Sequence, residues 1–152
     1  MGDGYEIGPV REGDLAALLD LYRHLNPGDP VLDPSGEILA HWRSILANPD
    51  VQLLGAYLND QLVATCVLVL IPNLTRGARP YGLIENVLTH PEHRKRGLGT
   101  ALLRHALDLA WSRNAYKVML LTGRRDEAVS RFYEKAGFLA GVKTGFVAYP
   151  DL

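Results

Sequence analysis

The chain has 152 residues, 47% of them apolar and 22% charged, and its formal net charge is −1. This length and composition predict one globular domain, residues 1–152, and exclude a disordered, collagen-like or coiled-coil chain. Residues 1–75 hold three basic and ten acidic residues (−7), whereas residues 76–152 hold thirteen basic and seven acidic ones (+6). Such an asymmetry can mark an anion site in one half and a cation-facing surface in the other.

Cys66 is the only cysteine, which excludes an internal disulfide and any thiolate-cluster metal site. His90 and His93 are separated by Pro91 and lack a nearby cysteine or carboxylate cluster, so we expect no metal. The most apolar run, 62–71, is too short for a membrane helix. The acidic N-terminus has no apolar signal core. We therefore expect a soluble, cytoplasmic protein that does not bind a membrane.

In chain order, residues 5–10 are predicted to form a strand, and Asp14 is a candidate N-cap for a first helix. A loop at 26–34, with three prolines, separates this helix from a second one that begins after Ser35 and ends before Asn48. Strands at 51–58 and 62–71 follow, and the polar residues 59–61 between them predict a hairpin turn.

The second half continues with a loop at 72–80, a strand at 81–89 and a glycine-bearing turn. A helix from Leu98 to about Asn114, a buried strand at 118–121 and a last helix from Asp126 to Lys135 follow. Short strands are predicted at 138–140 and 146–149. Hairpin-linked strands followed by helical crossovers indicate an α/β chain with a mixed sheet and helices on both faces.

The turn at 94–99, Arg-Lys-Arg-Gly-Leu-Gly, lies between a strand and an apolar helix. Its two glycines allow close backbone approach to a ligand, and the first N–H groups of the helix point toward whatever precedes it. With three basic side chains, the turn predicts an anion site suited to a pyrophosphate. It lacks the residues of a P-loop and the third glycine of a dinucleotide fingerprint. No aromatic residues alternate with the basic ones, so we expect no nucleic-acid binding.

The pattern Arg94-x-x-Gly97-x-Gly99, after the segment 88–92, resembles the signature of the GNAT superfamily of N-acetyltransferases. The segment 131–138, Arg-Phe-Tyr-Glu-Lys-Ala-Gly-Phe, resembles the last conserved block of that superfamily. The resemblance implies a GNAT fold: a mostly antiparallel, mixed sheet of six to seven strands with splayed central strands and about four flanking helices.

The resemblance also implies acetyl-CoA as co-substrate. Backbone N–H groups of the turn would hold the pyrophosphate, and the preceding strand would hydrogen-bond the pantetheine arm. Leu88, or else Val87, would present an N–H to the acetyl oxygen. Many relatives have a CoA-contacting asparagine where this chain has Asp126, which is equally suited to be a helix N-cap. The cofactor residues implied are Val87, Leu88, Thr89, Arg94, Lys95, Arg96, Gly97, Leu98, Gly99, Thr100 and Asp126.

Tyr133 matches the tyrosine that many members place near the CoA sulfur, where a neutral phenol can protonate the leaving thiolate. Glu85, on the strand before the turn, is a candidate base acting through water; alternatively, it only orients the substrate amine. Strand alternation predicts that Asn86 points to the opposite face and makes a structural hydrogen bond.

The predicted reaction is direct acetyl transfer, in a ternary complex, to a primary amine of a small molecule. Tyr22, Arg76 and Arg79 are candidate acceptor contacts; the two arginines would suit a substrate phosphate. The segment 84–87 resembles that of glucosamine-phosphate acetyltransferases, whereas the acidic first half favours a cationic amine. A protein or peptide amine and a non-catalytic acyl-CoA sensor stay open. An edge strand near the C-terminus makes a homodimer an expectation.

Overall fold

The computed structural model describes residues 4–151, and in this part of the chain five strands form one sheet in the order β1-β2-β3-β4-β5. The first four strands pair antiparallel, and β5 pairs parallel with β4. The expected mixed, mostly antiparallel sheet is therefore confirmed. The elements are β1 (Tyr5–Pro9), α1 (Leu15–Leu25), α2 (Gly36–Ala47), β2 (Val51–Leu58), β3 (Gln61–Ile71), α3 (Thr75–Ala78), β4 (Tyr81–Thr89), α4 (Leu98–Ser112), β5 (Val118–Leu120) and α5 (Glu127–Ala136), with short 3-10 turns η1 (Glu12–Asp14) and η2 (Pro91–His93).

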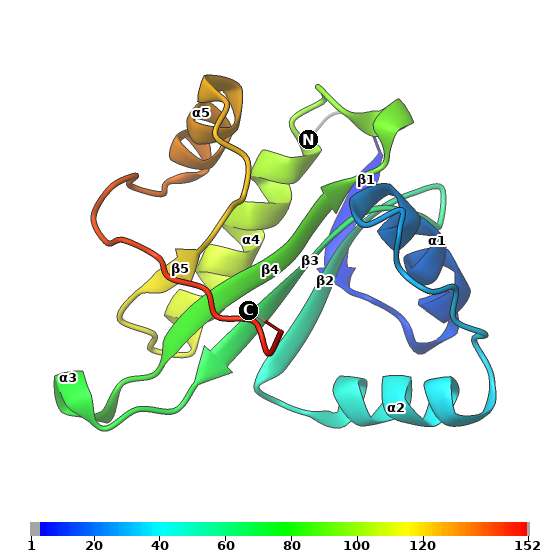
Figure 1. Ribbon diagram of the computed structural model, residues 1–152, viewed down its shortest axis with the longest axis horizontal. Helices are drawn as coiled ribbons and strands as arrows, with labels where there is room; N and C mark the ends of the chain where they lie inside the picture. Colours follow the sequence, from blue (N-terminus) through cyan, green and yellow to red (C-terminus); the bar gives the residue numbers. More distant parts are fainter. Residues whose placement is uncertain (1–3, 152) are drawn as a thin grey trace.

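The sheet is covered on both faces, with α1 and α2 on one side and α4 and α5 on the other (Figure 1). Alternation along β2 divides the core between the two sides. Leu53 and Tyr57 pack in the cluster that includes α1 and α2, whereas Leu54 and Ala56 pack in the cluster that includes α4. Because helices cover both faces, the middle strands are apolar almost throughout, as their sequences predict.

The hairpin between β2 and β3 turns at Asn59 and Asp60, whose φ angles are 49° and 63°. Two consecutive left-handed residues, with Asn first, are typical of the tight turns that match the twist of paired strands. The predicted hairpin is thus confirmed.

Two residues predicted as helix N-caps occupy the N-cap positions, but their side chains do not bond the backbone N–H groups of the helix. Asp14 and Asp126 both stand at N-cap positions, and neither side chain caps its helix. The Asp14 carboxylate instead accepts a 2.8 Å hydrogen bond from the Tyr57 hydroxyl, and the Asp126 carboxylate pairs with Arg124 at 3.0 Å. A short carboxylate bonds a strong donor within reach. For Asp14 a tertiary contact supplies the donor, whereas for Asp126 the donor is Arg124, two residues earlier in the chain.

The predicted strands at 138–140 and 146–149 are wrong: within residues 4–151 no strand follows α5, so the sheet has five strands instead of six or seven. Aromatic and β-branched residues favour strands only where a neighbouring strand pairs with them. This segment has no such neighbour. Its large apolar side chains are exposed: Leu139, Val142, Phe146, Val147 and Tyr149.

The strands β4 and β5 are joined at one end and separate at the other. Their pairing runs from Gly82 opposite Val118 to Ile84 opposite Leu120 and stops there. Beyond Ile84, β4 continues to Thr89 without a strand partner on that side in the described chain (Figure 1). The expected splay therefore exists, between β4 and the edge strand β5.

A β-bulge distorts the unpaired half of β4. Leu88 lies opposite Thr65 and Glu85 opposite Val67, so Asn86 and Val87 together oppose a single residue of β3. Asn86 has a φ of 53°, in the left-handed region. Bulges of this kind re-aim side chains and end regular pairing.

Candidate active site

A cleft of about 1220 Å³ opens beside the unpaired half of β4, between that strand, the start of α4 and the helix α5. The end of α1 forms one wall. We call this space the cleft. Its lining residues are His24 to Asn26, Ile84 to Thr89, His93 to Lys95, Gly97 to Thr100, Leu120 to Arg124, Ala128, Val129, Arg131 to Tyr133, Lys135 and Tyr149.

The turn at 94–99 borders the cleft with an open helix end. Lys95 and Gly97 have left-handed φ angles of 64° and 77°, and α4 begins directly after Gly97 with no side chain capping it. The first N–H groups of a helix have no partner within the helix, and the helix dipole makes this end electropositive. Arg94 ties the turn to β4 by donating a 3.2 Å hydrogen bond from Nε to the Thr89 carbonyl oxygen.

The two glycines of the turn serve different needs. Gly97 has a positive φ angle, which residues with a Cβ adopt only at an energetic cost. Gly99 supplies space, because a Cβ there would lie 2.8 Å from two ring carbons of Phe132 on α5. The second glycine therefore lets α5 pack closely against the start of α4.

The charge of the cleft is mostly positive. Its lining contains a single carboxylate, that of Glu85, and five Lys or Arg side chains. Two of the five are paired: Arg124 with Asp126 at 3.0 Å and Arg131 with Glu127 at 3.4 Å. The cleft therefore suits a ligand with several anionic groups. The basic residues of the lining are Arg94, Lys95, Arg124, Arg131 and Lys135.

Tyr133 enters the cleft from α5 and is half-buried between two aromatic neighbours. Its ring packs edge-on against Phe132 and Phe138, with centroid distances of 4.9 and 6.2 Å. Burial raises the pKa of Tyr133; Arg124 opposes this shift, and Glu85 adds to it. The phenol therefore stays protonated at neutral pH and can donate its proton to a developing thiolate.

Glu85 and Asn86 both lie exposed in the cleft lining. The prediction that Asn86 makes a structural hydrogen bond on the face opposite Glu85 agrees with its partner, Tyr22 of α1, which lies on the α1 and α2 side of the sheet. A hydrogen bond links the Asn86 side chain to Tyr22, whose pKa burial raises to about 12.

Most of the residues expected at the active site lie together in the cleft. Those that line it are Glu85, Val87, Leu88, Thr89, Arg94, Lys95, Gly97, Leu98, Gly99, Thr100 and Tyr133. Those outside the lining are Tyr22, Arg76, Arg79, Arg96 and Asp126. The roles of both sets stay predictions.

The basic side chains outside the cleft have other contacts. Arg79 donates 3.2 Å hydrogen bonds from Nε and a terminal nitrogen to the carbonyl oxygens of Asn114 and Ala115. Arg76 stacks over the Tyr116 ring at 5.6 Å. Arg96 donates a 3.1 Å hydrogen bond to the hydroxyl of Tyr5. The cleft geometry thus offers no support for Arg76 and Arg79 as holders of a substrate phosphate.

Several cleft residues were not expected from the sequence. They include Leu25 at the end of α1, and Arg131 and Lys135 of α5. Arg131 and Lys135 could have been predicted together, because residues four apart lie on the same face of a helix. No local pattern brings the end of α1 to β4, because that contact depends on how the two elements pack.

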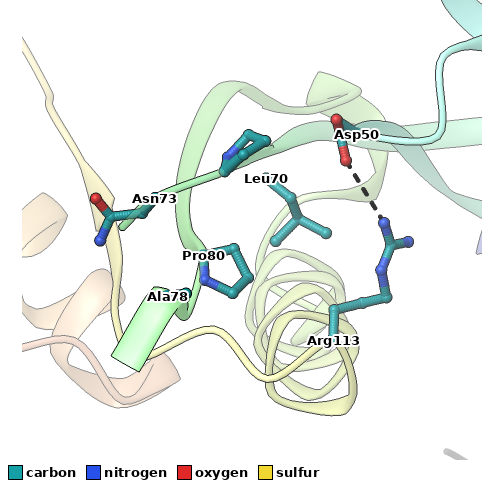
Figure 2. A pocket seen from close by; sticks show the side chains of 7 residues that line it. Asp50, Leu70, Asn73, Ala78, Pro80 and Arg113 are labelled. Carbon is teal, nitrogen blue, oxygen red and sulfur yellow. Dashed lines mark ion pairs between the residues drawn. The ribbon is translucent and has the colours of Figure 1, made fainter. Parts of the chain in front are cut away.

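A second, smaller hollow of about 270 Å³ lies at the other end of β4 and α4, as Figure 2 shows. Its two charged groups, Asp50 and Arg113, pair with each other at 3.6 Å. Arg113 also donates a 3.3 Å hydrogen bond to the Pro49 carbonyl oxygen. Because these two charged groups bond each other, the hollow is a weaker candidate for a ligand site than the cleft.

Among residues 4–151 no group of three or more His, Cys, Asp or Glu side chains is arranged to hold a metal ion. In the same part of the chain, no helix is both long and apolar enough to cross a bilayer. The thiol of Cys66 is fully buried, and burial raises its pKa to about 12. It is therefore a poor nucleophile at neutral pH.

A split sheet beside an open helix end and a basic cleft defines a protein built to bind an extended anionic ligand along one strand. Residues 15–138 match the model of the acetyltransferase (GNAT) family. The chain belongs to this family and is an N-acetyltransferase. The resemblance seen in the two sequence motifs is thus confirmed, and catalysis is favoured over the sensor alternative.

Three relatives illustrate the similarity. A glucosamine 6-phosphate N-acetyltransferase of Trypanosoma brucei brucei is 31% identical over 137 residues, 89% of each chain. The enzyme of the same name from Schizosaccharomyces pombe is 37% identical over 79 residues, which is 52% of this chain and 68% of the relative. A solved structure of an Agrobacterium tumefaciens protein assigned to the acetyltransferases has a TM-score of 0.89 and 47% identity, covering 95% of this chain and 99% of that one.

Proposed function

We propose that this enzyme transfers the acetyl group of acetyl-CoA to the amine of a hexosamine phosphate, by direct transfer in a ternary complex. Two relatives are named for acetylation of glucosamine 6-phosphate, and one of them covers 89% of this chain. The proposal narrows the small primary amine expected from the sequence to its amino-sugar-phosphate alternative.

The observation that carries the proposal is the charge of the cleft. Five basic side chains against one carboxylate suit two anionic ligands, the phosphates of CoA and a phosphate on the acceptor. A polycationic acceptor, such as a polyamine or an aminoglycoside, would meet like charge there. None of the acidic residues between 4 and 75 lines the cleft, so the acidic first half gives no support to a cationic acceptor.

The chain's own groups fit acetyl-CoA as co-substrate. The open N-terminus of α4 and the left-handed turn at Lys95 and Gly97 present N–H groups suited to a pyrophosphate. The unpaired edge of β4 offers backbone donors and acceptors to an amide-containing arm. In this role, Val87 or Leu88 would donate an N–H to the acetyl oxygen and stabilise negative charge that develops on it.

Glu85 would act on the substrate amine, and Tyr133 would act on the departing thiolate. The Glu85 carboxylate attracts and orients the substrate ammonium, directly or through water. Tyr133 supplies the proton that the departing thiolate needs, and its raised pKa keeps this proton in place at neutral pH.

A free-thiol assay with an amine panel tests the proposal. The panel contains glucosamine 6-phosphate, glucosamine, a polyamine, an aminoglycoside and a lysine peptide, each with acetyl-CoA. We expect kcat/KM for glucosamine 6-phosphate to exceed that for glucosamine by at least about 100-fold, because a charge-assisted phosphate contact is lost. Equal rates for the two sugars, or a preference for a polycation, would contradict the assignment.

A further inference from the structure

Three histidines, His24, His90 and His93, form a row at the wall of the cleft, and His24 lies outside both of the motifs that identify the family. His24 belongs to the last turn of α1, His90 follows β4, and His93 ends η2. The His24 and His90 rings meet edge-on with centroids 4.9 Å apart, and the His90 and His93 centroids are 5.8 Å apart. His24 and His93 both line the cleft.

The three rings differ in how they are engaged. The Nδ1 atom of His90 accepts a 3.2 Å hydrogen bond from the Glu92 N–H, and Nδ1 of His93 lies 3.5 Å from the Tyr5 hydroxyl. Among residues 4–151, neither ring nitrogen of His24 has a hydrogen-bond partner in the protein. His24 is exposed toward the cleft, and its ring is steadied by the edge of His90.

We propose that His24 is a catalytic residue: neutral His24 accepts the proton that the acceptor ammonium must lose before it attacks. This inference rests on the proposed function. The ammonium gives one proton to His24 and becomes an amine with a free electron pair. That pair forms the C–N bond as the C–S bond breaks. Tyr133 gives its proton to the departing sulfur, and the second proton lost by the nitrogen passes through water to the Tyr133 phenolate. His24 then returns its proton to solvent.

Proton affinity favours the imidazole over the carboxylate in this role. An alkyl ammonium has a reference pKa of about 10.4, compared with about 6.5 for histidine and about 4.3 for glutamate. Proton transfer from an ammonium to an imidazole is therefore, in general, less uphill than transfer to a carboxylate. Efficient general bases have pKa values near the working pH, and histidine is the side chain that meets this condition unaided. Glu85 keeps the task of holding the ammonium.

The charges around His24 come from every element packed against it, and they include both signs. A negative neighbour stabilises the protonated ring, and a positive one opposes it. The charged and titratable groups on these elements are Asp20 and Arg23 on α1, Glu85 on β4, His90, Glu92 and His93 around η2, and Arg94 and Lys95 in the turn; of these, His90 is in ring contact with His24.

The test is the pH dependence of kcat/KM for the wild type, H24Q and the control H41Q. Glutamine keeps a polar side chain of similar reach that does not titrate, and His41 is an exposed histidine of α2 outside the cleft. We expect H24Q to lose at least about tenfold in kcat/KM at neutral pH, to lose the acidic limb of the profile and to keep its affinity for acetyl-CoA. H41Q should match the wild type in all three.

Two further measurements separate catalysis from a structural role. Added imidazole should restore part of the rate in H24A. The histidine NMR resonance that is missing from H24Q should titrate with the same midpoint as the acidic limb, and this readout needs no turnover. An intact acidic limb in H24Q, a rise in KM alone or no rescue by imidazole would overturn the proposal.

The outcomes also separate this inference from the function on which it rests. A wild type that acetylates no hexosamine phosphate but does acetylate another amine, with the H24Q losses unchanged, overturns the substrate and retains His24. A wild type that prefers hexosamine phosphate, with H24Q at full rate, retains the substrate and overturns His24.

Discussion

The two ends of the β4–β5 pair show how one strand can be both structural and functional. At the closed end, Gly82 to Ile84 pair with β5, and Arg79 donates to the carbonyl oxygens after α4. At the open end, β4 has a bulge, no neighbour on the β5 side and a helix N-terminus beside it. The polar groups of the closed end bond one another, whereas those of the open end are left for ligands.

This difference teaches that the two hollows of the molecule are not equivalent sites. The small hollow at the closed end contains one cation and one anion that are already paired (Figure 2). The cleft at the open end has an excess of cations and a half-buried phenol. Substitutions at the open end should therefore change ligand binding and rate, and those at the closed end should change stability alone.

The largest expected effect comes from Gly99→Ala, because the added methyl group would overlap the Phe132 ring. Overpacking of this kind costs about 1–3 kcal/mol, roughly 3–10 °C in Tm, and the displaced turn should also bind acetyl-CoA more weakly. Thermal unfolding and acetyl-CoA titration measure the two effects.

The partner variant and the control for this prediction are specific. Phe132→Leu shortens the opposing side chain, so Gly99→Ala should cost less in that background, as a double-mutant cycle would show. Gly28→Ala adds a methyl group where no atom lies within 4 Å and should change neither property. A fully additive cycle would contradict the packing explanation for Gly99.

Next in size is Tyr133→Phe, which removes the phenol and keeps the ring between Phe132 and Phe138. We expect kcat to fall at least about tenfold, or about 1.4 kcal/mol, with unchanged acetyl-CoA affinity. Because burial raises the pKa of Tyr133, the wild-type rate should fall only at a pH above the ordinary range of a tyrosine, where the phenol ionises, and the variant should lack that alkaline limb.

The control for the phenol lies at the other end of the sheet. Tyr116→Phe removes a hydroxyl from a ring that stacks under Arg76, far along the chain from the turn. It should leave kcat unchanged. A Tyr133→Phe enzyme of wild-type rate, or one that fails only in acetyl-CoA binding, would argue against an acid at this position.

The smallest expected effect is that of Arg79→Ala at the closed end. The variant loses an exposed hydrogen bond to the Asn114 carbonyl oxygen and a partly buried one to that of Ala115, a loss of about 1 kcal/mol in the free energy of unfolding. Chemical denaturation should detect this change, whereas kcat and KM should stay as in the wild type. Lys143→Ala, at an exposed cation, serves as control; a raised KM in Arg79→Ala would return this arginine to the acceptor site.

Local patterns in the sequence predicted most of the helices and strands, because apolar periodicity and turn residues act over a few positions. They predicted the hairpin at Asn59 and Asp60, the strand before the turn and the helix that starts at Leu98. They failed at 138–140 and 146–149, where strand propensity has no partner strand. They also failed at Asp14, whose carboxylate bonds the distant Tyr57, and at Asp126, whose carboxylate bonds the neighbouring Arg124.

The sequence by itself determined the family and the turn at 94–99, since glycine, charge and position along the chain define both. Tertiary structure alone decided what shares the cleft with that turn. Asn86 bonds Tyr22 of α1, the packing of α1 on β4 brings His24 to the cleft, and Arg79 bonds the carbonyl oxygens after α4. These positions depend on contacts between residues far apart in the chain, and local sequence patterns do not predict such contacts.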